Sequence, residues 1–427
     1  MKKCILFLLI IILCFGSVGC KNDNSKHPSD QPLDTGVNST SDVLAAHWDY
    51  YVNDNQYMIG PQTFLLSPNQ QTFQGDMKYN LTTHTVTPVC MDELCNHTNR
   101  SDCKIKGDNI YYFIHQNKLY YNRSYYEIVG SYEVIGQNGK TEIQYITETH
   151  QCFCSYDLTT GDYRELLDIN VSEVETMKRV ILYENSAYYL RYFPNKSNPQ
   201  TVEDYTLSLC CMNLNSGKER LVFDATQFLN QSSVLIFAKD HRFYFANNQL
   251  GTLLSIDQEG KDVKILIDGQ GENFASFDRY GTFLCGDWIY YAVPAVAADG
   301  DKFTAAGISS GYYLFRVHIE NGTKEKLSDD LITSFNVTNG YIYYFLSSQQ
   351  YTAEKNAEAN PIEEDCEVII RIDHDGSNRH LMGYVEGRAV LSWIVKGELY
   401  ISFFTHGVRF SLSDGKTRNI LNDEIIN

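Results

Sequence analysis

The stretch "RVILYENSAYYLRYF" (Arg179–Phe193), followed closely by "SLCCMNLNSGKERLVF" (Ser208–Phe223), decides the fold class of this chain. Each segment holds two short runs rich in apolar and aromatic residues. The first pair is separated by Glu184-Asn185, and the second by a turn that ends at Gly217. Such turn residues between two β-rich runs indicate antiparallel hairpins. Two consecutive hairpins predict a unit of four antiparallel strands.

The second hairpin recurs along the whole chain. A glycine marks its turn in six copies, and a seventh copy, "MKYNLTTHTVTPVC" (Met77–Cys90), carries His84 at that place. Glycine is favoured there because turn positions with a positive φ suit a residue without a side chain. The six turn glycines are Gly161, Gly217, Gly260, Gly322, Gly376 and Gly415.

A strand pair also precedes each of the seven hairpins, so the whole chain repeats a four-stranded unit. Repeats of four strands with glycine-marked turns and aromatic-rich strands are typical of β-propellers. We therefore predict an all-β fold, a β-propeller of four-stranded antiparallel blades. Seven blades are expected, although six or eight remain open, and an array of β-sandwiches is the main alternative. No strand exchange between the first and last blades is evident, and paired tyrosines such as Tyr188-Tyr189 are expected to fill the space between blades.

The first residues have the pattern of an export signal. Lys2 and Lys3 precede the apolar run from Cys4 to Phe15, which is too short to span a bilayer but suits a signal peptide. The small residues that end at Cys20 resemble the lipobox of bacterial lipoproteins, apart from Ser17, where leucine is usual. The resemblance implies cleavage before Cys20 and lipidation of that residue, with an ordinary cleaved signal or an uncleaved anchor as alternatives.

This reading divides the chain into three parts. Residues 1–19 form the signal peptide, residues 20–45 form a lipidated cysteine with a polar, flexible tether, and residues 46–427 form the propeller. We expect the protein at the cell membrane, lipid-anchored on its extracytoplasmic face. The net charge of −18 argues against a nucleic-acid partner and against docking on anionic lipid.

The connections between strands predict where a partner binds. With strands named A to D from the axis outward, the A–B and C–D turns are short, whereas several B–C connections are long. Variable loops on one face of a rigid scaffold favour binding there, although tolerated insertions without a role are the alternative. No apolar patch is evident, so the expected partner is a polar ligand or a protein. The long connections are residues 124–146, 194–205, 295–311 and 349–366.

The densest group of reactive side chains lies in "VCMDELCNHTNRSDC", between the first and second units. Its spacing is Cys-x4-Cys-x-His-x5-Cys, and the ligand types suit a tetrahedral zinc ion. A disulfide with one spare thiol, or reduced thiols without a role, are the alternatives. As a connection from strand D to strand A, the loop is expected on the same face as the long insertions. The candidate metal ligands are Cys90, Cys95, His97 and Cys103.

Together, the lipobox, the polar tether, the tyrosine-rich repeats and this cysteine-histidine loop resemble the β-propeller surface lipoproteins of Firmicutes, which are related in style to YWTD and TolB-type propellers. The resemblance covers Cys20 and about residues 46–424. It implies a surface-anchored propeller of unassigned ligand and carries no catalytic residue to this chain. No cofactor is assigned, apart from a possible structural zinc.

Two functions follow from these observations. The first is a non-catalytic binding or scaffold module for an envelope glycan, a peptide or a protein. The second is an extracytoplasmic enzyme, a glycan hydrolase or lyase, with paired carboxylates at the mouth of the axis. The predicted inner strands hold almost no Asp or Glu, which favours the binding module.

Overall fold

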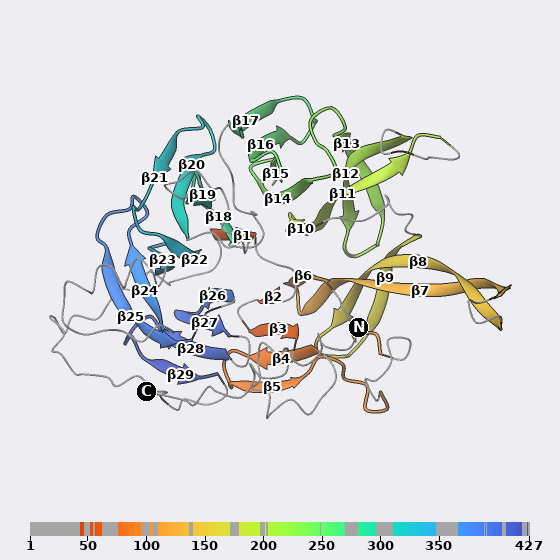
Figure 1. Cartoon of the computed structure of the whole chain (residues 1–427), viewed down its shortest axis with the longest axis horizontal. Helices are drawn as coiled ribbons and strands as arrows, with labels where there is room; N and C mark the ends of the chain where they lie inside the picture. Colours follow the sequence, from red (N-terminus) through yellow and green to blue (C-terminus); the bar gives the residue numbers. More distant parts are fainter. Residues whose placement is uncertain are drawn as a thin grey trace, which may run out of the picture.

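The computed structural model describes most of the body of the chain. It covers residues 43–46, 52–53, 56–61, 76–95, 103–105, 110–135, 140–170, 179–196, 201, 204–247, 249–269, 281–295, 311–346, 366–387, 389, 391–403, 407–420 and 425. These residues form antiparallel strands grouped in fours around a central axis, as Figure 1 shows. The predicted all-β class and the β-propeller are therefore confirmed.

The first four blades are separate four-stranded sheets, each made of strands that follow one another in the chain. Blades one and two consist of β2 (Val52–Asn53), β3 (Tyr57–Pro61), β4 (Asp76–Asn80), β5 (Thr85–Pro88), and of β6 (Ile110–His115), β7 (Lys118–Ile135), β8 (Thr141–Asp157), β9 (Tyr163–Asn170). Blades three and four consist of β10 (Val180–Tyr183), β11 (Ser186–Pro194), β12 (Tyr205–Asn213), β13 (Glu219–Asp224), and of β14 (Ser233–Lys239), β15 (Arg242–Asn247), β16 (Thr252–Asp257), β17 (Val263–Ile267).

Blades five and six share hydrogen bonds through the pair Tyr312 and Ile332, so their strands form one larger sheet with β1. Blade five consists of β18 (Thr282–Cys285), β19 (Trp288–Pro294), β20 (Tyr312–His318) and β21 (Lys324–Lys326). Blade six consists of β22 (Ile332–Val337), β23 (Ile342–Leu346), β24 (Cys366–Ile372) and β25 (His380–Glu386). Blade seven consists of β26 (Leu391–Val395), β27 (Glu398–Ser402), β28 (Gly407–Ser411) and β29 (Thr417–Asn419).

One further strand was not expected. β1 (Val43–Ala46) runs antiparallel to β18 on the axis side of blade five, with Val43 opposite Cys285 and Ala46 opposite Thr282. The boundary expected at residue 46 therefore falls inside a strand. Because β18 is the inner strand of its blade, β1 lies nearer the axis than the blade itself (Figure 1).

The short turns have the backbone geometry that the sequence predicts. The two-residue loops between the first strands of a blade are left-handed, for example at Glu184 (φ 47°) and Asn185 (φ 59°). This geometry matches the right-handed twist of the flanking strands. His84, which replaces the turn glycine in blade one, also has a positive φ of 54°.

Seven buried apolar clusters fill the interfaces between neighbouring blades. The two tyrosines of each pair pack in different clusters, because successive side chains of a strand point to opposite faces of the sheet. Tyr188 packs in the cluster between blades three and four, and Tyr189 packs in the cluster between blades two and three. Tyr343 and Tyr344 divide in the same way around blade six. The tyrosine pairs thus form the core, as predicted.

The ring closes between blades seven and one by side-chain packing. Each of these blades is built from consecutive strands, so the described residues show no strand exchange, as expected. Trp393 donates from Nε1 to Met58 Sδ at 2.6 Å, and the Tyr79 hydroxyl donates to the Ile420 carbonyl at 2.6 Å. The buried guanidinium of Arg409 pairs with Glu398 at 2.8 Å and lies 3.4 Å from His84 Nε2. His84 therefore links its turn to the last blade.

Candidate functional site

The two faces of the propeller differ, as predicted. The A–B turns and the C–D turns lie on the same face of the propeller. Two small pockets show this, since each is lined by residues from both kinds of turn. One pocket of about 90 Å³ brings Gln116 and Asn185 from two A–B turns against Asn215 from a C–D turn. We call this side the turn face, and the opposite side, with the B–C and D–A connections, the insertion face. Two of the four long connections, 295–311 and 349–366, fall mostly outside the described residues, 194–205 is half described, and the one in blade two falls mostly inside them.

The axis offers no acid pair on its described inner strands. The inner strands of neighbouring blades contact one another, which places them around the axis. Strands β6, β10, β14, β18, β22 and β26 contain no Asp or Glu. Their polar groups include a small cluster in which Asn336 donates to the Ser392 hydroxyl at 2.9 Å. Hydroxyl and amide groups alone do not supply the two carboxylates that glycoside hydrolysis commonly uses.

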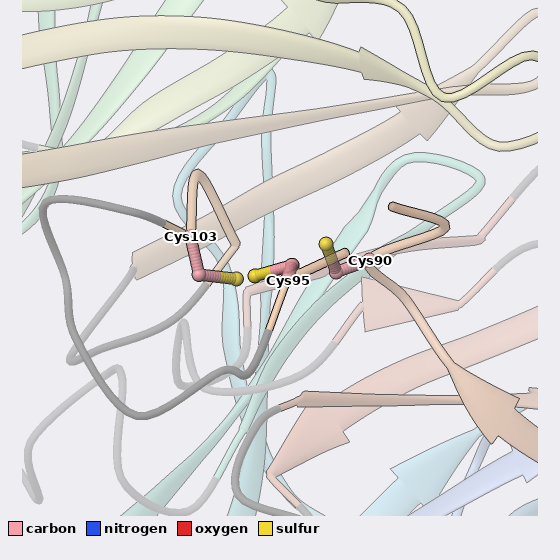
Figure 2. A group of neighbouring side chains, drawn as sticks. All are labelled: Cys90, Cys95 and Cys103. Carbon is pink, nitrogen blue, oxygen red and sulfur yellow. The ribbon is translucent and has the colours of Figure 1, made fainter. Parts of the chain in front are cut away.

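Three sulfurs converge where blade one joins blade two. The Sγ atoms of Cys90, Cys95 and Cys103 all lie within 4.8 Å of one another. Figure 2 shows the three side chains grouped together. Cys103 is buried, whereas Cys90 and Cys95 are half-buried. Among the described residues, these three cysteines are the one group of metal-ligating side chains close enough together to hold a metal ion. The structure therefore brings together three of the four predicted ligands, and His97 lies outside the described residues.

Local structure explains how a short loop places these thiols. Cys90 follows β5, and a turn after it is held by Asp92, whose carbonyl accepts from Cys95 N at 3.1 Å and whose carboxylate accepts from Leu94 N at 2.9 Å. The loop is attached to blade two because Met91 N donates to the Tyr156 hydroxyl at 2.9 Å.

The cluster is part of an interface rather than an exposed loop tip. Val89, Cys103 and Ile105 are buried in the apolar cluster between blades one and two, and Cys90 and Cys95 pack against it. The loop was expected on the insertion face beside the long insertions. The sulfurs instead lie between the two blades, and the loop contacts Tyr156 at the C-terminal end of β8, beside the C–D turn of blade two.

Burial raises the pKa of two thiols in this cluster. Burial raises the pKa of Cys103 to about 12, and the thiols of Cys95 and Cys90 add to the shift. Burial also raises the pKa of Cys90. The pKa of the neighbouring Tyr156 is raised as well, mainly by burial. Burial therefore favours the neutral thiol form of Cys90 and Cys103.

The other described cysteines are core residues. Cys152 and Cys154 lie on one face of β8, in the same cluster between blades one and two, as predicted from their spacing. Cys210 and Cys211 point into different interfaces, also as predicted. Cys285 is buried too, and Cys366 is half-buried at the start of β24.

The long connection of blade two is a β-hairpin arm. β7 and β8 continue past the blade as a two-stranded ribbon, which Figure 1 shows projecting outward from the ring. Beyond Asn122, β7 pairs only with β8, and before His150, β8 pairs only with β7. Tyr125 and His150 stack at the base of the arm, with their ring centroids 4.9 Å apart. Both outer edges of the ribbon therefore carry backbone groups without a strand partner.

The arm exposes large apolar side chains, contrary to the expectation that apolar patches are absent. Register places five of them on one side, which we call the apolar face of the arm. A register shift at Val129 keeps both ends of β7 in phase with this face. Tyr126 is 70% exposed, Ile135 83% and Tyr145 60%. The apolar face consists of Tyr126, Ile128, Ile135, Ile143 and Tyr145.

The opposite side of the arm is mixed, because it carries the half-exposed Tyr132 and Ile146 together with three carboxylates. Glu127, Glu142 and Glu148 project there, whereas Glu133 is the one carboxylate that shares the apolar face. The arm thus exposes large apolar side chains on both sides, with more of them on the apolar face, and sequence reasoning missed it by treating residues 124–146 as a loop. Alternation of period two in "TEIQYITE" is the signal that identifies such a strand.

Comparison with known proteins agrees with the fold. An oligogalacturonate lyase in complex with manganese is 11% identical, with 88% of this chain and 89% of that chain covered and a TM-score of 0.46. TolB from Acinetobacter baumannii is 11% identical over 74% of this chain and 77% of its own, with a TM-score of 0.32. The nidogen/laminin complex gives 9% identity, 63% and 88% coverage and a TM-score of 0.34.

These likenesses concern the fold alone, which binding proteins and enzymes share. All three TM-scores are below 0.5, so these are distant similarities that assign no role to this chain. No protein-family model and no curated protein matches the sequence. No helix among the described residues has the length and apolar character needed to cross a bilayer.

Proposed function

We propose that this chain is a lipoprotein anchored at Cys20 on the extracytoplasmic face of the cell membrane, and that its propeller is a non-catalytic binding or scaffold module. The β-hairpin arm carries this proposal. Monomeric proteins rarely expose contiguous large apolar patches, and those that do commonly use them to bind a partner. The inner strands that the structure describes lack the carboxylates of the alternative enzyme.

The direction of β1 shows that this strand begins at the turn face of the propeller. Val43 pairs with Cys285, next to the turn at Gly286, so the chain reaches β1 from the turn face. We propose that the tether from Cys20 joins the propeller on this face, where β1 begins.

Replacing Cys20 with alanine tests the anchor. We expect the protein to move from the membrane fraction to the soluble fraction or the medium, because the attached acyl chains hold the wild type on the bilayer. Cys4→Ala is the matched control, since Cys4 lies in the apolar run of the signal, and it should leave the protein in the membrane. Cell fractionation with intact-mass measurement is the readout. A wild type without added lipid mass would contradict the anchor.

The arm favours a protein partner with an apolar surface. Two-stranded ribbons are marginally stable in water on their own, so a partner that covers the apolar face would stabilise this one. Tyrosine is among the residues that contribute most to protein interfaces. Open strand edges add backbone donors and acceptors that a partner strand can pair with. A polar glycan would leave the isoleucines of the arm in water.

Photo-crosslinking on cells tests the arm. With p-benzoylphenylalanine in place of Tyr145, we expect a cross-linked protein adduct. The same replacement at Tyr384, a partly exposed tyrosine on β25, should give little adduct. The double variant Tyr126→Ser/Ile143→Ser should reduce the adduct at position 145 more than tenfold, because hot-spot side chains contribute about 2 kcal/mol each. Its melting temperature should stay unchanged, since both side chains are exposed. Equal adducts at positions 145 and 384 would contradict the proposal.

A further inference from the structure

The geometry points to a metal site: we propose that Cys90, Cys95 and Cys103 bind one Zn²⁺ ion that fastens blade one to blade two. The three sulfurs lie within 4.8 Å of one another around a common point. Thiolates at about 2.3 Å from a tetrahedral zinc ion are about 3.8 Å apart, so the cluster needs only small movements to close on the ion. This inference is independent of what the arm binds.

The exposure of the three cysteines suits such a site. Cys103 is buried and 2% exposed, so it forms the floor of the cluster. Cys90 and Cys95 are half-buried, which leaves a path for an ion from solvent. Structural zinc sites commonly take three cysteines and one further ligand, and among the described residues no fourth side chain joins the cluster.

A zinc ion accounts for all three thiols, whereas a disulfide accounts for only two of them. On binding, three S–H bonds are exchanged for three Zn–S bonds, three protons pass to solvent, and the metal keeps its oxidation state. A disulfide would join two sulfurs, require an oxidant to take two electrons, and leave the third thiol against the new bond. A metal uses all three sulfurs at once.

The position of the cluster gives the ion a structural role. β5, the outer strand of blade one, has only four residues and pairs with β4 alone. Beyond it, Val89 and Cys103 pack in the core shared with blade two, and Met91 is held by Tyr156. An ion bound by Cys90 and Cys103 joins the end of blade one to the chain that leads into blade two.

Native mass spectrometry of the full chain, purified in detergent without a thiol reductant, tests the site directly. We expect one Zn²⁺ per chain in the wild type and none in Cys95→Ser. Cys366→Ser is the matched control, because Cys366 is also half-buried but lies in blade six, and it should keep the ion. Replacing the ion with Co²⁺ should give an intense sulfur-to-cobalt absorption band in the wild type and not in Cys95→Ser.

A thermal measurement keeps the test decisive if Cys95→Ser folds poorly. Removing zinc from the wild type with a chelator should lower the melting temperature by about 5 °C, and adding Zn²⁺ should restore it. Cys366→Ser should behave in the same way. The proposal is overturned by a wild type without zinc, by a mass two hydrogens lower with a disulfide within this loop, or by equal zinc content in Cys95→Ser.

Discussion

Replacing Trp393 with alanine lowers the free energy of unfolding by about 4 kcal/mol, the cost typical of a buried tryptophan. Trp393 is 2% exposed, stacks on Tyr400 and donates its indole N–H to Met58 Sδ in blade one. Since the described strands of blades one and seven are not exchanged, side-chain packing of this kind holds the ring closed. Chemical denaturation followed by tyrosine and tryptophan fluorescence measures the loss.

Trp288→Ala is the matched control for this prediction. Trp288 is only partly buried at the edge of the cluster between blades five and six, away from the closure, with Arg316 4.0 Å from its ring centroid and His318 edge-on to it. We expect a loss of about 1–2 kcal/mol, because a partly exposed ring leaves a smaller cavity. If both variants lose the same stability, closure between blades seven and one does not depend on Trp393.

The fold followed from the sequence because every blade repeats local signals. Two-residue turns such as Glu184-Asn185 fix the register of the inner hairpin, and paired tyrosines such as Tyr188-Tyr189 supply one side chain to each face. These signals are local, so they survive in a single sequence. β1 has no such signal, because its four residues become a strand only through pairing with β18, far away in the chain.

The candidate sites were predicted in part. The convergence of Cys90, Cys95 and Cys103 follows from a short loop, because a few residues cannot carry the three thiols far apart. Its placement between blades depends on Tyr156, 65 residues further along the chain, which sequence spacing does not reveal. The arm was missed because residues 124–146 were treated as a loop, although Ile143 and Tyr145 alternate as a strand requires.

The turn glycines have a second cause, in the packing between blades, that the sequence does not reveal. The sequence explains them by a positive φ, yet His84 adopts a φ of 54° at the same place. Several of the glycine turns differ from the His84 turn because they pack closely against the preceding blade. A Cβ atom built on Gly376 would lie 2.2 Å from the carbonyl oxygen of Leu327, in the outer part of blade five. The turn packs so closely that a side chain has no room.

Gly376→Ala is therefore expected to cost about 3 kcal/mol or more. Adopting φ +86° costs an alanine roughly 1–2 kcal/mol, and the overlap with the Leu327 backbone adds a comparable penalty because a backbone atom cannot rotate away. Gly322→Ala is the matched control, since Gly322 has φ +69° in the equivalent turn of blade five, but its Cβ would lie 3.5 Å from the Leu266 oxygen, an ordinary contact. It should cost only about 1–2 kcal/mol. Equal losses of stability in denaturant titrations would mean that the positive φ alone requires glycine at position 376. A larger loss for Gly376→Ala would show that the close approach between blades also requires it.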